Sequence, residues 1–149
     1  SEDSLKIKIL LKLCWEYRNF NPELSLQYGL EAINLANKYK DYEGCANAHS
    51  FVGVAYRILG NYSKAIDHYF TGLDIANSHG IKEQEGFAYI NLANLHVYQG
   101  YYNKASENLN KALVIANETN NQSMLAYVFA NFGRAKLLNN ELQRTLVFR

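Results

Sequence analysis

Apolar and small residues recur at three- and four-residue steps along the chain, which is the spacing of one face of an α-helix. Between residues 41 and 80 they form two stripes. The first stripe contains Ala48, Val52, Ala55, Tyr56 and Leu59, and the second contains Ala65, Ile66, Tyr69, Leu73 and Ala76. This periodicity predicts two consecutive helices and no strand in the segment.

Gly60 and Asn61 separate the two stripes. Glycine accepts the left-handed backbone found just past a helix end, and an asparagine side chain can cap the free amides of the next helix. Gly80 ends the second stripe in the same way. In the first forty residues, Asn21 takes the capping place and Pro22 the first helical position, where a missing N–H costs nothing. The pattern therefore predicts tight helical hairpins.

The segment 41–80 is repeated by the segment 81–120 without a gap. The identities are Glu43/Glu83, Ala48/Ala88, Gly60/Gly100, Tyr62/Tyr102, Lys64/Lys104, Ala65/Ala105, Leu73/Leu113, Ile75/Ile115, Ala76/Ala116 and Asn77/Asn117. A more diverged copy precedes them, and an incomplete fourth copy begins near Gln122. We therefore predict one all-α domain over residues 1–149, with repeats at about 1–40, 41–80, 81–120 and 121–149. It should contain seven full helices and a partial eighth.

Composition and charge narrow the possible functions. The 149 residues are 48% hydrophobic and 19% charged, and 15 Lys and Arg against 14 Asp and Glu leave a formal charge of +1. Such a weak field disfavours a nucleic-acid partner. No stretch approaches the ~18 apolar residues of a membrane span, so we expect no membrane contact. Localisation stays open between the cytoplasm and, if a signal or membrane segment precedes Ser1, the periplasm.

The sequence contains no constellation of residues that indicates catalysis. Two cysteines are too few for a disulfide framework or a structural zinc site, and we expect them to be buried or half-buried thiols. The histidines form no i, i+4 pair with a glutamate, as a helical zinc protease would require. The two cysteines and four histidines of the chain are Cys14, Cys45, His49, His68, His79 and His96. We therefore expect no catalytic residue, no metal site and no cofactor in this segment, although the full-length protein could carry a kinase or another output domain.

Copies two and three contain small and aromatic residues at set places. Copy two has Val52-Gly53, Tyr56, Gly60-Asn61-Tyr62, Ala65, Tyr69 and Gly72; copy three has Tyr89, Leu92-Ala93, Gly100-Tyr101-Tyr102, Ala105, Leu109 and Ala112. This pattern resembles the tetratricopeptide repeat (TPR) family. His96 departs from it by replacing the family's tyrosine, and Asn77 and Asn117 replace its terminal proline. The resemblance implies a right-handed α-solenoid of helical hairpins that binds a protein or peptide and is not an enzyme.

The forty-residue period is longer than the family's usual period of about 34 residues. In this it is similar to the repeats of bacterial signalling proteins, such as TPR-containing sensor histidine kinases. The resemblance implies a sensor or interaction domain of a larger two-component signalling protein. A peptide-pheromone receptor and a general assembly scaffold are the alternatives, and an RNA-binding helical repeat is disfavoured by the neutral charge.

The resemblance also implies that the first helix of each copy lines a concave groove. Counting by forty residues, we predict a ligand-binding set made of Asn47, Phe51, Arg57, Phe87, Asn91, Asn94, Tyr98, Tyr127, Asn131 and Arg134. Asparagine amides can hold an extended peptide backbone, an arginine can take a carboxylate, and aromatic rings can form apolar pockets. The alternative is that these side chains are solvated or pack against neighbouring helices.

The carboxylate clamp of the chaperone-docking members of the family is absent. Its positions here carry Leu10, Cys14, Phe51, Phe87 and Asn91, where those members have lysine, asparagine and arginine. A chaperone adaptor is therefore disfavoured.

The end of the chain is apolar. Counting by forty residues places Leu142 on Tyr102, so the second helix of the fourth copy should have begun there. We expect Leu146, Val147 and Phe148 to lie against another copy of the chain or against a further segment, because terminal repeats normally have a polar outer side. The alternative is that this short helix folds back onto the fourth copy.

Overall fold

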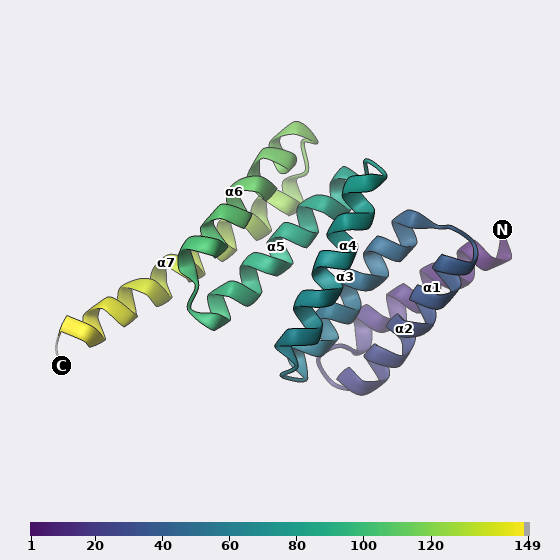
Figure 1. Ribbon diagram of the computed structural model, residues 1–149, viewed down its shortest axis with the longest axis horizontal. Helices are drawn as coiled ribbons and strands as arrows, with labels where there is room; N and C mark the ends of the chain where they lie inside the picture. Colours follow the sequence, from purple (N-terminus) through teal and green to yellow (C-terminus); the bar gives the residue numbers. More distant parts are fainter. Residues whose placement is uncertain (148–149) are drawn as a thin grey trace.

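The chain folds into a row of α-helices, and the computed structural model describes residues 1–147. The helices are α1 (Glu2–Tyr17), α2 (Pro22–Lys38), α3 (Tyr42–Ile58), α4 (Tyr62–Ser78), α5 (Lys82–Gln99), α6 (Tyr102–Glu118) and α7 (Gln122–Val147). They follow one another along the longest axis of the molecule, with the two ends of the chain at opposite ends of that axis (Figure 1). No strand occurs within residues 1–147, which confirms the all-α prediction for them.

The turns between helices satisfy backbone groups that the helix ends leave unpaired. The Asn61 side chain accepts a hydrogen bond from the Lys64 N–H at 3.2 Å, and Asn21 caps α2 in the same way immediately before Pro22. Gly60 and Gly80 adopt φ angles of 83° and 66°, in the region that glycine enters at little cost. The predicted turns and caps are therefore confirmed.

In the second and third hairpins, a small residue on the first helix faces a larger residue on the second. A Cβ atom added to Gly53 of α3 would overlap the ring of Tyr69 on α4, which is fully buried. In the next hairpin, Ala93 and Leu109 occupy the corresponding places and are also fully buried. From the second hairpin to the third, the glycine is replaced by a larger alanine and the tyrosine by a smaller leucine. The two changes compensate in volume, so the interface stays filled.

The helices that begin each copy lie closer together than the helices that end it. The backbones of α1, α3, α5 and α7 approach one another in sequence, whereas no Cα atoms of α2, α4 and α6 lie within 8 Å of each other. Closer spacing on one side of the row bends the row toward that side. The surface formed by α1, α3, α5 and α7, here called the first-helix face, is therefore the inner, concave side.

The predicted partial eighth helix is absent from the described residues, because α7 continues without a break to Val147. Gly100 ends α5 with a φ angle of 80°, but the residue forty positions later is Asn140, which remains helical. Asparagine can follow a helix end in this chain, since Asn120 adopts a φ angle of 52° after α6, but Asn140 does not adopt that backbone and α7 stays helical. Although α7 is the longest helix, none within residues 1–147 is both long and apolar enough to cross a membrane.

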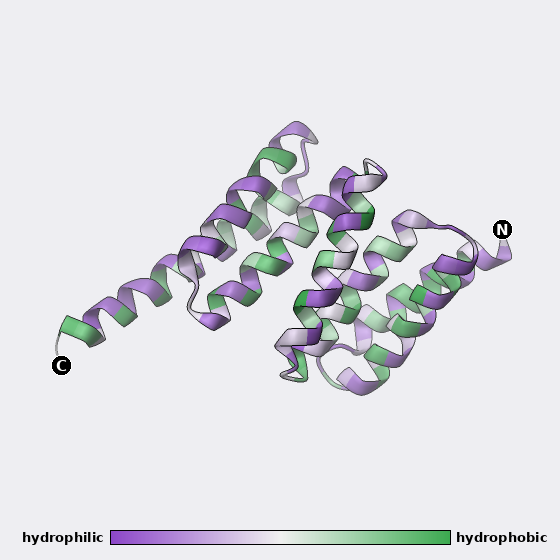
Figure 2. Cartoon of the chain, in the orientation of Figure 1, coloured by the Kyte–Doolittle hydropathy of each residue, from purple (hydrophilic) through white to green (hydrophobic). Residues whose placement is uncertain are grey.

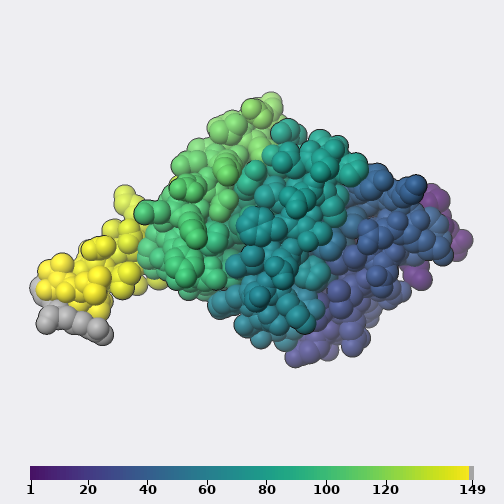
Figure 3. Space-filling model, in the orientation of Figure 1, coloured from purple at the N-terminus to yellow at the C-terminus, as the bar shows by residue number. Residues whose placement is uncertain are grey.

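The end of α7 projects beyond the rest of the molecule (Figure 3), and its surface is mostly hydrophilic with a hydrophobic patch near the end (Figure 2). Leu146 and Val147 are 57% and 75% exposed. The alternative in which this segment folds back onto the fourth copy is therefore wrong for the residues up to Val147. Phe148 lies outside the described residues.

Cys14 and Cys45 are free and buried, as predicted. Burial raises the pKa of both thiols, and the neighbouring Asp41 carboxylate acts in the same direction on Cys45. Both side chains therefore act as small packing residues between helices.

Candidate functional site

Polar and aromatic side chains connect adjacent helices across the first-helix face. Residues forty positions apart meet at two points: Arg134 Nη1 donates a hydrogen bond to Asn94 Oδ1 at 3.2 Å, and the rings of Phe87 and Tyr127 lie edge to face at 6.1 Å. The repeat register therefore correctly identified neighbours on this face.

Two arginines flank Tyr98 of α5 on this face. The guanidinium carbons of Arg57 from α3 and Arg134 from α7 lie 5.5 Å and 5.9 Å from the centre of the Tyr98 ring. Tyr98 is 53% exposed, so the ring is open to solvent between two cations. The ion pairs within residues 1–147 join Lys6 to Glu31 and Lys82 to Glu85, and neither involves these arginines. This part of the face therefore presents positive charge beside an aromatic surface.

Arg57 also approaches the hydroxyl group of Tyr69, which lies beneath the face. Burial raises the pKa of Tyr69 to about 12, and the Arg57 guanidinium opposes this rise. The hydroxyl oxygen has no hydrogen bond of good geometry within residues 1–147. Arg57 is thus held between a buried hydroxyl and the exposed Tyr98 ring, which restricts its rotamers.

The asparagines predicted to form a ladder do not all reach the surface. Asn47, Asn91 and Asn94 are half-buried and remain partly accessible. Asn131 is only 4% exposed, and its Nδ2 donates to the Tyr127 carbonyl oxygen at 2.9 Å. The expectation of an exposed amide at Asn131 is therefore wrong: its side chain turns back along α7 and pairs with the preceding turn.

Two residues that the sequence reasoning missed extend the face at α1. The Trp15 ring lies 5.0 Å from the ring of Phe51, and the Arg18 guanidinium lies 3.6 Å from the Trp15 ring centre. The positions forty and eighty residues after Trp15 are Ala55 and Leu95, which are fully buried. The register therefore gave no sign that the Trp15 side chain is 36% exposed.

The histidines do not gather on this face. His49 of α3 and His68 of α4 meet with their Nδ1 atoms 2.9 Å apart, and the Tyr56 ring stacks on His68. Burial lowers the pKa of His49 to about 4, and burial also lowers the pKa of His68. Within residues 1–147 no group of three or more His, Cys, Asp or Glu side chains is placed to hold a metal ion. The pair is a packing contact of the second hairpin.

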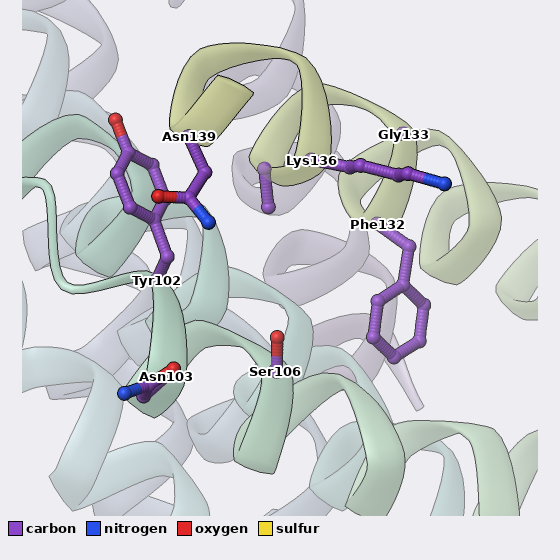
Figure 4. A pocket seen from close by; sticks show the side chains of 8 residues that line it. Tyr102, Asn103, Ser106, Phe132, Gly133, Lys136 and Asn139 are labelled. Atoms are coloured by element: carbon purple, nitrogen blue, oxygen red, sulfur yellow. The ribbon is translucent and has the colours of Figure 1, made fainter. Parts of the chain in front are cut away.

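A pocket of about 370 Å³ lies between α6 and α7. Figure 4 shows it lined by Tyr102, Asn103 and Ser106 from α6 and by Phe132, Gly133, Lys136 and Asn139 from α7, and Ala135 completes the lining. At the equivalent junction of α4 and α5, the places of Ser106 and Ala135 are taken by Ile66 and Leu95, which pack in one cluster. Two shorter side chains therefore account for the pocket.

Filling this pocket should stabilise the protein. We expect Ser106→Ile together with Ala135→Leu to raise the free energy of unfolding by about 1–2 kcal/mol, because the pair restores the packing seen between α4 and α5. Urea denaturation measures the change. The reverse pair, Ile66→Ser with Leu95→Ala, is the matched control and should lower stability by more than this. A loss of stability in the filled variant would show that the pocket cannot accept these side chains.

Comparison with known proteins identifies the fold and a family match. The family model described as anaphase-promoting complex subunit 5 matches residues 54–136, which is more than half of the 149-residue chain. Among solved structures, the TPR domain of Arabidopsis FLU is similar with a TM-score of 0.69 and 21% sequence identity, over 78% of this chain and 98% of that chain. This likeness confirms a solenoid of TPR-type hairpins. No curated protein matches the sequence.

Proposed function

We propose, because the chain belongs to the anaphase-promoting complex subunit 5 family, that it is a protein-interaction module whose first-helix face binds an extended segment of a partner protein. A TPR-type helical solenoid is typically non-catalytic and binds other proteins. The observation that carries the proposal is the open Tyr98 ring between Arg57 and Arg134, neither of which has a carboxylate partner within residues 1–147.

The chemistry of the face favours a partner segment with both acidic and apolar side chains. A carboxylate can pair with Arg134 at the exposed end, since arginine presents its donors in a planar fork that matches two carboxylate oxygens. Asn91 and Asn94 can each donate to and accept from the partner backbone. Phe87 and Tyr127 offer an apolar surface for a side chain. Asn131 is left out of the contact set because it is buried.

Two settings fit this role. The family takes its name from a subunit of the anaphase-promoting complex, which supports a scaffold that holds other proteins in an assembly. The forty-residue repeats support the alternative, a sensor or interaction domain of a bacterial two-component protein, including a receptor for a peptide signal. The exposed Leu142, Leu146 and Val147 are proposed as a further contact with another copy or a following segment, which the mass in solution tests.

The binding face can be tested with a double substitution. A partner peptide is first selected from a library of extended acidic and apolar sequences by binding to the protein. We expect Asn91→Ala with Arg134→Ala to weaken binding of that peptide about tenfold, because each lost contact contributes ~0.5–1.5 kcal/mol. Fluorescence polarisation measures the dissociation constant.

The matched control removes an amide and a cation from another surface. Asn110 and Lys111 are exposed on α6, and Lys111 lies 5.4 Å from the centre of the Tyr89 ring, much as Arg134 lies beside Tyr98. Asn110→Ala with Lys111→Ala should leave the affinity unchanged. Equal affinities for the protein and the face variant would exclude the first-helix face as the binding surface.

A further inference from the structure

The hydroxyl group of Tyr69 is buried beneath the first-helix face without a hydrogen bond of good geometry within residues 1–147. The residue is fully buried and its ring lies against Gly53 of α3, so the side chain has no path to solvent. Burial raises the pKa of Tyr69, and Arg57 opposes this rise through its charge and as a nearby hydrogen-bond donor. A buried polar group without a partner is destabilising, so its presence requires an explanation.

The direction of the Tyr69 side chain brings its hydroxyl group toward Arg57. Side chains of a helix tilt toward its N-terminus, and the short turn at Gly60 and Asn61 places the start of α4 beside the end of α3. The Tyr69 ring lies against Gly53, and Arg57 is one turn further along the same side of α3. The tip of the ring therefore reaches the base of the Arg57 side chain.

The other copies show that a hairpin of this kind requires neither group. Forty residues later, Leu109 holds the place of Tyr69 and Val97 holds the place of Arg57, and both are buried. The first copy also lacks the pair, with a glycine at the place of Tyr69 and a tyrosine at the place of Arg57. The arginine and the hydroxyl group beneath it therefore occur together in the second copy only, which indicates that they act together.

The guanidinium group of Arg57 lies beside the Tyr98 ring, where that of Arg134 lies as well. The two guanidinium carbons are 5.5 Å and 5.9 Å from the ring centre. Neither arginine forms an ion pair within residues 1–147, although Arg134 donates a hydrogen bond to Asn94. Two cations this close repel each other, and one carboxylate bound at Arg134 would leave Arg57 without a counter-charge. The arrangement therefore has room for a second carboxylate.

We propose, on the basis of the function proposed above, that the first-helix face selects a partner segment with two acidic side chains, one at Arg134 and one at Arg57, and that Tyr69 positions Arg57 for this contact. Both arginines lie beside one ring, and an extended segment rises about 3.3 Å per residue, so the two acidic residues are within about four positions of each other. The second acidic position and the role of Tyr69 go beyond the contacts described for the face.

Tyr69 acts by ordering Arg57 before the partner binds. A long side chain loses rotamer freedom when it is fixed at an interface, and this loss weakens binding about threefold to tenfold. The hydroxyl group beneath Arg57 and the Tyr98 ring beside it restrict the side chain in advance, so less freedom is lost on binding. Phenylalanine at position 69 would keep the packing but would not hold the guanidinium group.

The positioning role is tested first without a partner, with Tyr69→Phe in the full 149-residue protein. NMR relaxation of the arginine Nε–H groups measures how ordered each guanidinium group is. We expect Arg57 to become more mobile in this variant and Arg134 to remain as it was. Tyr89→Phe is the matched control, because Tyr89 is a half-buried tyrosine of α5 beside the cation of Lys111. It should leave Arg57 unchanged, and unchanged mobility of Arg57 in Tyr69→Phe would overturn the positioning role.

The second acidic position is tested with the labelled peptide selected from the acidic and apolar library. Each acidic residue of the peptide is replaced in turn by its amide, and fluorescence polarisation measures the affinity. We expect two positions, within about four residues of each other, where the amide weakens binding at least about threefold. The effect at one position should disappear in the Arg57→Ala protein and the effect at the other in the Arg134→Ala protein.

Tyr69→Phe should weaken binding of the unmodified peptide about threefold to tenfold, through the lost ordering of Arg57. The same change made in the Arg57→Ala protein should have no effect, because nothing is left to position. A purely structural role of Tyr69 would give equal effects in both proteins, and that result would overturn the proposal. Tyr89→Phe should again leave the affinity unchanged.

The outcomes separate this proposal from the proposed function. If Asn91→Ala with Arg134→Ala weakens binding and Arg57→Ala does not, the face binds its partner but the second acidic position is wrong. A peptide in which only one acidic residue matters would lead to the same conclusion. If neither protein variant weakens binding, the proposed function fails and the second acidic position fails with it.

Discussion

Gly53→Ala is expected to lower the free energy of unfolding by up to about 2 kcal/mol, although alanine favours a helix more than glycine does. The added methyl group would overlap the buried Tyr69 ring and lie 3.2 Å from the Ala65 carbonyl oxygen. Overpacking of this kind costs about 1–3 kcal/mol, which exceeds the gain of ~1 kcal/mol from helix propensity. Urea denaturation measures the change.

The third copy suggests the compensating substitution. Because Ala93 and Leu109 hold the places of Gly53 and Tyr69, Gly53→Ala should be tolerated better when Tyr69→Leu accompanies it. We expect the double variant to be more stable than the sum of the single changes by at least about 1 kcal/mol. Gly133→Ala is the control and should raise stability by up to ~1 kcal/mol, since nothing lies near the added atom. Additive effects at Gly53 and Tyr69 would contradict the packing argument.

Acid is expected to destabilise the second hairpin through His49 and His68. Burial lowers the pKa of His49 from 6.5 to about 4, so the unfolded chain binds more protons than the folded chain between these values. The stabilising contribution is therefore complete above about pH 6.5 and is lost as the pH falls toward 4. Two charged rings with Nδ1 atoms 2.9 Å apart would also repel each other. We expect a loss on the order of 1–2 kcal/mol, because solvent reaches part of the pair.

A variant that copies the third repeat at these two positions isolates the effect. Tyr89 and Asn108 stand where the second copy has His49 and His68, so His49→Tyr with His68→Asn should keep the hairpin packed. The stability difference between pH 7.5 and pH 4.5, measured by urea denaturation, should be smaller in this variant. Asp67 and Lys64 beside His68 remain in both proteins, and so does His96, whose pKa burial also lowers. An unchanged pH dependence would assign the acid sensitivity to other groups.

Much of the fold could be predicted from the sequence because turn residues and helix stripes act locally. Gly60 and Asn61 adopt the backbone and the cap that their chemistry favours. The end of α7 could not be predicted in this way. The repeat register placed a turn at Asn140, but a turn forms only when its residues favour it and the next helix has a surface to pack on. The repeat register contains no information on whether the residues favour a turn or on whether the next helix has a surface to pack on.

For the candidate site, the sequence predicted which residues of adjacent helices are neighbours, but not how each side chain is oriented. Counting by forty residues correctly placed Asn94 beside Arg134 and Phe87 beside Tyr127. It could not show that Asn131 is buried, because a register assigns a side of the helix and not a side-chain rotamer. The pocket between α6 and α7 could not be predicted from a motif, because a cavity left by short side chains produces no sequence pattern. Comparing Ile66 with Ser106 position by position would have indicated it.

The row of helices also has a mechanical character that follows from its packing. Since the backbones of α2, α4 and α6 stay apart from one another, the row can change its curvature by small rotations where one copy meets the next. The resistance to such rotation comes from dispersion contacts across each junction. The junction of α4 and α5 is filled by Ile66 and Leu95, whereas the junction of α6 and α7 contains the 370 Å³ pocket. The joint of α6 and α7 is therefore softer than the joint of α4 and α5, and it takes more of the elastic adjustment to a bound partner.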